Sequence, residues 1–204
     1  MQSRNQNMAA PRQDRSRQDC SRQDSSRGKP IPAAVHVARH DSPLGVIWSV
    51  WTTRGLWRLQ WGNERPECAG QIPAKAVRNW TKLLDERLSS FFEFGCTTFE
   101  TIQVDESNWT PFMKSVYRHC RDIQPGTTLT YKQLAERAGS PRASRAVGSS
   151  MARNRIPIVI PCHRVVASSG HLCGFSAPGG LETKQYLLDL ESDQAVQLTA
   201  AFAS

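Results

Sequence analysis

The order of apolar and polar positions predicts strands and then a helix in the first half of the chain. Residues 46–61, VIWSVWTTRGLWRLQW, read as two β-rich runs joined by a hairpin at Thr53-Arg54-Gly55. From Val77 to Phe91 apolar side chains recur at helical spacing, and Gly95 follows as a stop signal. The segment FETIQV, residues 99–104, favours a further strand. These elements predict a small α/β domain over residues 31–105, with the hairpin tryptophans in its core: Trp48, Trp51, Trp57 and Trp61.

The second half favours short helices. Thr110-Pro111 is a good N-cap with proline at the first helical position. Thr130 can cap a second helix, YKQLAERA, which Gly139 ends, and Ser140-Pro141 starts a third, PRASRAVGSSMARN. Two short helices joined by a tight glycine turn indicate a helix-turn-helix within a second domain, residues 106–192.

The two ends differ from these domains. Residues 12–26 repeat the units RQDRS, RQDCS and RQDSS, which hold almost no apolar side chain, so residues 1–30 are expected to be a disordered tail. Residues 193–204 are expected to form a second tail. Three aspartates in the repeats count against a mitochondrial presequence, and neither a membrane span nor a secretory signal is visible. The expected location is intracellular, cytoplasmic in a bacterium and nuclear in a eukaryote.

Charge narrows the class of partner. The net charge is +8, and residues 110–165 hold ten basic and two acidic side chains. A basic segment inside a foldable region suggests a phosphate-bearing partner, although a solvated basic face is the common alternative. Small residues with Arg142, Arg145 and Arg153 between them cover the third helix, which allows close approach either to a DNA groove or to a neighbouring helix.

Candidate chemistry lies in RIPIVIPCHRVV, residues 155–166. The six cysteines show neither C-x-x-C pairs nor zinc-finger spacing, so a disulfide framework and structural zinc are not expected. An apolar strand before Cys162 would raise the pKa of its thiol, so something must offset that desolvation. On a strand His163 would point to the other face, so a bridging water could relay the proton and a carboxylate could orient the imidazole. A thiol beside a DNA-binding element suggests chemistry on DNA.

PCHRVV, preceded by RAVGSSMARN and followed by GGLETKQYLLDLE, resembles the C-terminal domain of the O6-alkylguanine-DNA alkyltransferases. The resemblance is nearly continuous from Gly126 to Glu191 and loose over residues 42–105. It implies an α/β (α+β) fold: an N-terminal domain with an RNase H-like sheet and a C-terminal winged helix-turn-helix domain. It also implies repair of DNA by irreversible, single-turnover transfer of an alkyl group from O6-alkylguanine to Cys162. The implied protein is a monomer that needs no metal or cofactor and binds double-stranded DNA through the minor groove.

The resemblance implies roles for individual residues. His163, through a water, would take the proton of Cys162, Glu191 would orient His163, and Asn154 would hold the turn before the cysteine. Tyr131 would crowd the target phosphate and protonate the departing guanine. The implied DNA-binding residues also include Arg142, Ala143, Ser144 and Arg145, of which Arg145 would fill the gap in the base stack. Val165, Phe175 and Ser176 would line the guanine pocket.

The chain departs from the family pattern at four places. Arg155 stands where proline is usual, which predicts a looser turn or an added phosphate contact. Phe175 replaces a frequent tyrosine, Ala177-Pro178 is an insertion, and Cys173 is either a packing residue or a second thiol near the pocket. Two other functions stay open: a non-enzymatic winged-helix protein that binds alkylated DNA and recruits partners, and a Cys-His hydrolase.

Overall fold

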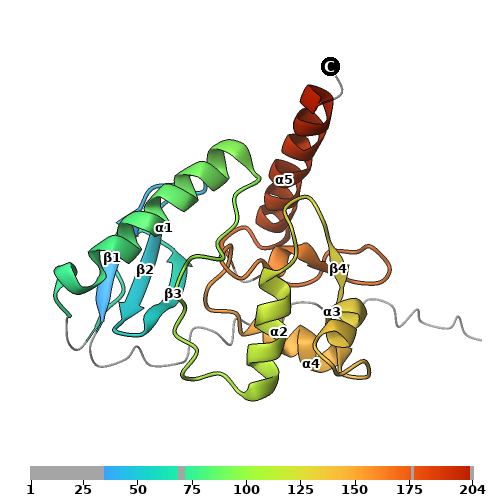
Figure 1. Cartoon of the computed structure of the whole chain (residues 1–204), viewed down its shortest axis with the longest axis horizontal. Coiled ribbons are helices and arrows are strands. Elements are labelled where there is room, and N and C mark those ends of the chain that lie inside the picture. The colour runs from blue at the N-terminus through green and yellow to red at the C-terminus, as the bar shows by residue number, and fades with distance from the viewer. Residues whose placement is uncertain (1–34, 69–71, 176, 203–204) are drawn as a thin grey trace, which may run out of the picture.

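An antiparallel sheet with one long helix makes up the first part of the structure, a computed structural model that describes residues 35–68, 72–175 and 177–202. Strands β1 (His36–His40), β2 (Ile47–Thr52) and β3 (Gly55–Trp61) are neighbours in that order (Figure 1). The predicted hairpin is confirmed. Gly55 has φ 137°, and a Cβ there would lie 2.7 Å from the carbonyl oxygen of Gln103, so no larger residue fits. Helix α1 (Ala74–Phe94) ends as predicted at Gly95, which has φ 66°.

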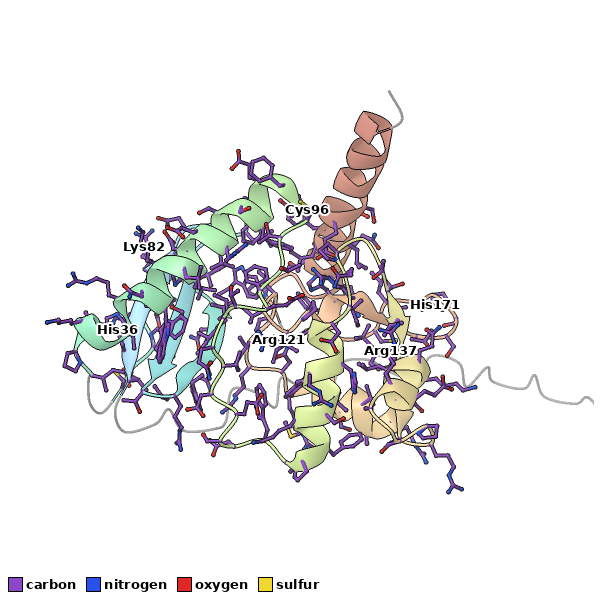
Figure 2. All side chains as sticks on the ribbon, viewed as in Figure 1. His36, Lys82, Cys96, Arg121, Arg137 and His171 are labelled. Atoms are coloured by element: carbon purple, nitrogen blue, oxygen red, sulfur yellow. The ribbon has the colours of Figure 1, made fainter. Side chains whose placement is uncertain are left out.

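The strand predicted at residues 99–104 is wrong. These residues form turns and loop, and Val104 makes only an isolated bridge with Leu56. The guanidinium of Arg121, a side chain labelled in Figure 2, explains the difference. Its Nη2 donates to the carbonyl oxygens of Phe99, Glu100 and Ile102 at 2.8, 3.1 and 3.1 Å. Three carbonyl groups that converge on one side chain bend the segment away from a ladder.

Short helices follow, as predicted. Helix α2 (Pro111–Arg121) begins after Thr110, whose side chain accepts from the N–H of Met113. Strand β4 (Leu129–Thr130) leads into α3 (Tyr131–Arg137), which Thr130 caps in a reciprocal capping box. Helix α4 (Ser144–Ala152) begins later than predicted. The N–H of Ala143 donates to the carbonyl of Ser140, so a turn precedes it and Arg142 lies outside the helix.

The apolar run before the cysteine is a compact turn, so the predicted strand there is wrong. Asn154 accepts from the N–H of Ile156 at 3.0 Å and donates to the carbonyl of Ile160 at 2.8 Å, which closes residues 155–160 into a loop. Two prolines in the run also lack the N–H that a ladder needs. The short 3-10 helix η2 (Cys162–Arg164) and strand β5 (Val165–Val166) follow, and β5 pairs in parallel with β4.

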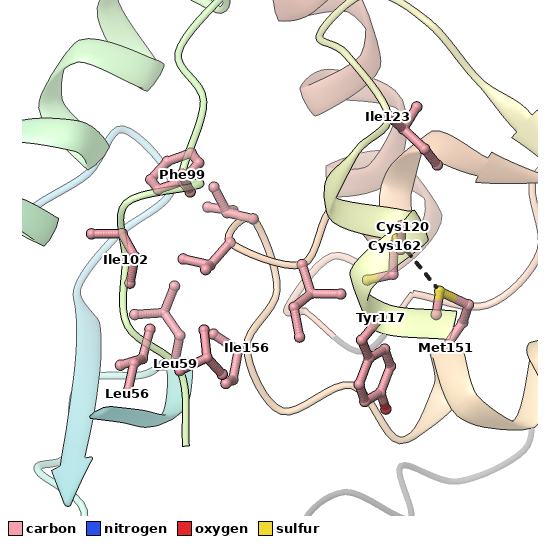
Figure 3. Close-up of a cluster of buried hydrophobic side chains, with 14 of the residues drawn as sticks. Leu56, Leu59, Phe99, Ile102, Tyr117, Cys120, Ile123, Met151, Ile156 and Cys162 are labelled. Atoms are coloured by element: carbon pink, nitrogen blue, oxygen red, sulfur yellow. Dashed lines mark hydrogen bonds between the residues drawn. The ribbon is translucent and has the colours of Figure 1, made fainter. Parts of the chain in front are cut away.

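One buried hydrophobic cluster joins both halves of the chain. It contains Leu56 from β3, Phe91 from α1, Ile156 and Cys162 from the turn and η2, and Leu187 from the last helix, α5 (Leu181–Phe202); Figure 3 shows part of it. A smaller cluster holds Val35, Val37, Val50 and Trp57. Of the four hairpin tryptophans, Trp51 and Trp57 are buried, and Trp48 and Trp61 are half-buried. In the described part of the chain, no helix is long and apolar enough to cross a membrane.

Candidate active site

Cys162 opens η2 directly after Pro161, with 6% of its surface exposed. Burial raises the pKa of its thiol. The side chain of Asn154, the charge of Lys184 and the backbone N–H groups of Cys162 and His163 act in the opposite direction. The resting group is therefore a thiol, in surroundings that partly stabilise the thiolate. Asn154 thus closes the turn before Cys162 and also counteracts the rise in the pKa of the Cys162 thiol.

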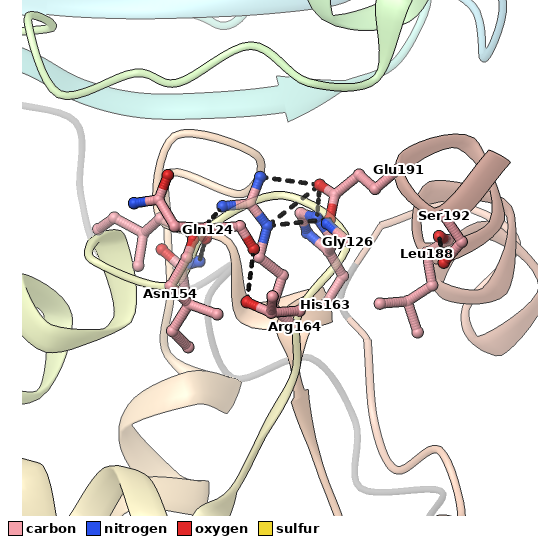
Figure 4. A network of polar contacts seen from close by, with 11 residues as sticks. Gln124, Gly126, Asn154, His163, Arg164, Leu188, Glu191 and Ser192 are labelled. Atoms are coloured by element: carbon pink, nitrogen blue, oxygen red, sulfur yellow. Dashed lines mark hydrogen bonds and ion pairs between the residues drawn. The ribbon is translucent and has the colours of Figure 1, made fainter. Parts of the chain in front are cut away.

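His163 is completely buried, and its Nε2 lies 2.8 Å from Oε1 of Glu191 (Figure 4). Burial lowers the pKa of His163, so the imidazole is neutral at neutral pH. Glu191 stays ionised, because hydrogen bonds from His163 and Arg164 lower its pKa although burial alone would raise it. An ionised carboxylate accepts from Nε2–H, so Nδ1 carries the free lone pair. Nδ1 is buried with no hydrogen-bond partner among the described residues, which leaves a base available.

Arg164 anchors the carboxylate from a second side. Its Nε lies 3.1 and 3.0 Å from the two oxygens of Glu191, and its Nη2 lies 2.8 Å from Oε1. Its Nη1 donates to the carbonyl oxygen of Ile123, and the N–H of Gly126 donates to Glu191. The sequence analysis missed this role, although Arg164 belongs to the quoted PCHRVV motif. The fork of a guanidinium fixes the carboxylate in one orientation.

Lys184 is a second residue that the sequence analysis missed. It is fully buried in α5, and its Nζ donates to the carbonyl oxygens of Val165 at 2.7 Å and Cys173 at 3.2 Å. Burial lowers its pKa, while the Cys162 thiolate would raise it. The available signal was its position seven residues before Glu191, which puts both on one face of a helix. Lys184 therefore ties β5, directly after η2, to the loop that leads to Phe175.

The predicted pocket residues are partly brought to this site. Val165 is fully buried next to η2, and the ring of Phe175 lies 6.4 Å from the ring of His163 at 84°. Ser176 lies outside the described residues. Cys173 is half-buried and takes part through its carbonyl group. Among the described residues, no group of His, Cys, Asp and Glu side chains is arranged to hold a metal ion.

The predicted DNA-binding residues gather on α3, α4 and the turn between them. Tyr131 is the half-buried first residue of α3, and a Cβ at Gly148 of α4 would lie 4.0 Å from its ring. Arg142 and Arg145 are exposed, whereas Ala143 and Ser144 are half-buried at the start of α4. Met151 of the same helix belongs to the buried cluster that contains Cys162. Helix α4 therefore links an exposed basic surface with the surroundings of the thiol.

Known proteins match both the sequence and the fold. Residues 111–193 match the family described as 6-O-methylguanine DNA methyltransferase, DNA binding domain. A methylated-DNA-protein-cysteine methyltransferase from Methanosarcina barkeri is 38% identical over 157 residues, which are 75% of this chain and 94% of that protein. The chain belongs to this methyltransferase family. The resemblance expected from PCHRVV is thereby confirmed.

Solved methyltransferase structures share the fold. The crystal structure of Mycobacterium tuberculosis O6-methylguanine methyltransferase is 30% identical and has a TM-score of 0.64, covering 78% of this chain and 94% of that one. A crystal structure of Mycobacterium tuberculosis OGT in complex with DNA has the same identity and a TM-score of 0.61, covering 79% and 94%. The mixed α and β architecture of this family member is therefore that of known methyltransferases.

Proposed function

We propose that this protein repairs DNA by direct reversal, moving a methyl or other alkyl group from O6-alkylguanine in double-stranded DNA to Sγ of Cys162. The observation that carries the proposal is the buried His163–Glu191 pair next to Cys162, which leaves imidazole Nδ1 as a free base. Family membership supports the same reaction. The complex of the Mycobacterium tuberculosis relative with DNA supports DNA as the partner.

Proton transfer begins the reaction. His163 Nδ1 has no direct hydrogen bond to Cys162, so a water molecule between them carries the thiol proton to the imidazole. Glu191 holds Nε2–H and stabilises the imidazolium that forms, while Arg164 keeps the carboxylate in place. Because burial raises the pKa of the thiol and lowers that of the imidazole, the ion pair is a minor species at rest. Lys184 stabilises the thiolate through its charge.

Alkyl transfer is a displacement at carbon. The Cys162 sulfur forms a bond to the alkyl carbon as the bond from that carbon to guanine O6 breaks, and the electron pair leaves with the guanine. Tyr131 supplies a proton to the departing base, and the proton that His163 took from the thiol returns through solvent to Tyr131. The product is a thioether on Cys162 and an unmodified guanine. The thioether is stable, so each molecule acts once, and the balance needs no co-reactant besides the DNA.

The DNA must present its damaged base to a buried sulfur. A guanine alkylated at O6 lies within the duplex, so it is flipped out into a pocket lined by Val165 and Phe175. Arg145 fills the gap from the minor groove, and the small side chains at the start of α4 allow the backbone to approach. In this proposal α3 and α4 are the helix-turn-helix of a winged domain, β1 to β3 belong to an RNase H-like sheet, and the protein acts as a monomer.

Mass spectrometry tests the proposal directly. The full chain is incubated with a duplex that carries one O6-methylguanine, with Cys162→Ala in parallel. We expect one methyl group on the peptide that contains Cys162, in equal amount to the repaired guanine, and none on the variant. Tight binding of the duplex with an unmodified Cys162 would instead support a non-enzymatic protein that recognises alkylated DNA.

A further inference from the structure

Arg155 lies against a tryptophan of the N-terminal sheet. Its Cζ is 4.4 Å from the ring centroid of Trp57, in β3. Arg155 is 8% exposed and Trp57 1% exposed, so this contact is internal. A guanidinium at this distance over an indole ring is held by a cation–π attraction. Because the side chain is buried, the phosphate contact suggested by the sequence is not available to Arg155.

The backbone of Arg155 is held by the same strand. The N–H of Leu59 donates to the carbonyl oxygen of Arg155 at 2.8 Å. Strand β3 therefore contacts Arg155 at two points. Trp57 packs against the Arg155 side chain, and the N–H of Leu59 binds the Arg155 carbonyl group. Arg155 is the first residue of the turn 155–160 that leads to the reactive cysteine.

A short path of hydrogen bonds runs from this point to Cys162. The N–H of Ile160 donates to the carbonyl of Ile156 at 2.9 Å, and the N–H of Cys162 donates to the carbonyl of Ile160 at 2.8 Å. Within the turn Ile158 has φ 70°, a left-handed conformation that is unfavourable for a β-branched residue. Such strain persists only where the surroundings hold the backbone in place. The turn is therefore restrained from outside as well as by Asn154.

Packing alone does not explain an arginine at this position. Among the described residues, Arg155 Nη1 and Nη2 and Trp57 Nε1 are buried without a hydrogen-bond partner. Burial and the nearby charge of Arg58 lower the pKa of Arg155, so its surroundings disfavour the cation. An apolar side chain of similar length avoids that penalty. What an apolar chain lacks is the directional attraction to the Trp57 ring.

We infer that Arg155 is a positioning residue for Cys162, through which Trp57 and β3 fix the turn that presents the sulfur. The inference rests on the proposed alkyl transfer and adds a part for the N-terminal sheet in it. Proline, usual in the family at this position, restrains φ through its own ring. In this chain the Arg155 side chain, held against Trp57 of β3, supplies the restraint on the turn.

Single-turnover kinetics of the full chain test this inference. Arg155→Met keeps the length of the side chain and removes its charge, and we expect the transfer rate at saturating O6-methylguanine duplex to fall about tenfold, because a displaced sulfur attacks less often. The duplex concentration at half-saturation should stay constant, and the thermal midpoint should stay the same or rise. Arg155→Pro should recover most of the lost rate. Arg58→Ala is the matched control, because Arg58 also lies over the Trp57 ring, at 4.8 Å, but outside the turn.

The outcomes separate the inference from the proposed function. A wild-type chain that leaves Cys162 unmodified refutes the proposed function itself. A wild-type chain that reacts, with Arg155→Met at the same rate, refutes the inference alone. If Arg155→Met transfers the alkyl group more slowly and its thermal midpoint is also lowered, the inference is refuted as well, because general destabilisation then accounts for the loss of rate. If Arg155→Pro does not fold, the transfer rates of Arg155→Met and Arg58→Ala are compared. A lower rate for Arg155→Met supports the inference, and equal rates refute it.

Discussion

Glu191 is the common hydrogen-bond acceptor of the two neighbouring residues His163 and Arg164. The carboxylate lies 2.8 Å from His163 Nε2 and 2.8 Å from Arg164 Nη2, and all three side chains are buried. One ionised oxygen thus fixes the tautomer of the imidazole and compensates a buried guanidinium. Helix α5 carries this group, so the last helix of the structure completes a site that begins at η2.

Replacing Glu191 by glutamine tests the carboxylate. We expect single-turnover alkyl transfer to slow by about 10²-fold, because an amide does not stabilise the imidazolium that forms on His163. The free energy of unfolding should fall by roughly 3–5 kcal/mol, because Arg164 is left as an uncompensated buried charge. Rapid quenching and urea unfolding measure the two effects. Asp189→Asn, an exposed change on the same helix, is the control, and an equal loss of rate there would refute the assigned role.

Acidification should weaken the fold through His163. Burial lowers the pKa of His163 from its ordinary 6.5, so below that pH the unfolded chain binds a proton that the folded protein does not. The free energy of unfolding therefore falls as the pH drops below about 6.5. Glu191, whose pKa is lowered from its ordinary 4.5, adds a further loss at lower pH. Urea unfolding between pH 8 and 4 should show a shallower decline for His163→Gln, and identical slopes would contradict the assignment.

Lys184→Met tests the charge beside the thiol. Without this cation the pKa of Cys162 should rise further, and each unit of that rise lowers the thiolate fraction about tenfold at neutral pH. The pH profile of alkyl transfer should then shift toward alkaline pH. Lys132→Met, an exposed lysine on α3, is the control. A uniform loss of rate at all pH values would show that Lys184 acts only through its bonds to the Val165 and Cys173 carbonyls.

Arg145 offers a way to separate base flipping from chemistry. In the proposed function Arg145 fills the gap in the base stack, so we expect Arg145→Ala to slow transfer from a duplex by about 10- to 100-fold, because a few kcal/mol of unstacking is then uncompensated. Transfer from the free base O6-benzylguanine, which needs no flipping, should be unchanged. Arg137→Ala, on the exposed end of α3 (Figure 2), is the control. A matching loss with the free base would place Arg145 in the chemical step instead.

Gly55 provides a test of the fold. Gly55→Ala adds a Cβ 2.7 Å from the Gln103 carbonyl at φ 137°, so the clash is added to a backbone strain of about 1–3 kcal/mol. Gly45→Ala has a positive φ of 96° but nothing within 4 Å of the new atom, so only strain applies. Thermal unfolding should show the larger loss for Gly55→Ala. Equal losses would show that the contact with Gln103 relaxes freely.

Local signals predicted the elements that local interactions form. Thr110 and Thr130 cap their helices with their own side chains, and Gly95 ends α1 by its own conformation, so a few neighbouring residues contain the information. The strand expected at residues 99–104 failed because Arg121, about twenty positions away, bends it. The strand expected before Cys162 failed because the Asn154 side chain closes a turn.

The candidate site also divides into residues that sequence motifs predict and residues that only distant contacts identify. Cys162, His163 and Glu191 were expected from motifs that resemble a family, and the structure brings His163 and Glu191 into contact. Arg164 and Lys184 were missed, because a lysine or arginine in a sequence is usually solvated. Only the packing of α5 on η2 buries them and gives each a fixed partner. The contact of Arg155 with Trp57 joins residues nearly one hundred positions apart, and no local pattern marks it.

The position of α5 in the chain also affects how the protein is made. Cys162 leaves the ribosome before Lys184 and Glu191, because the helix that carries them is translated afterwards. A nascent chain that has reached only β5 thus holds its nucleophile without the carboxylate that orients the base or the cation that stabilises the thiolate. The proposed alkyl transfer, which uses Cys162 together with Lys184 and Glu191, therefore becomes available only once α5 has docked on η2.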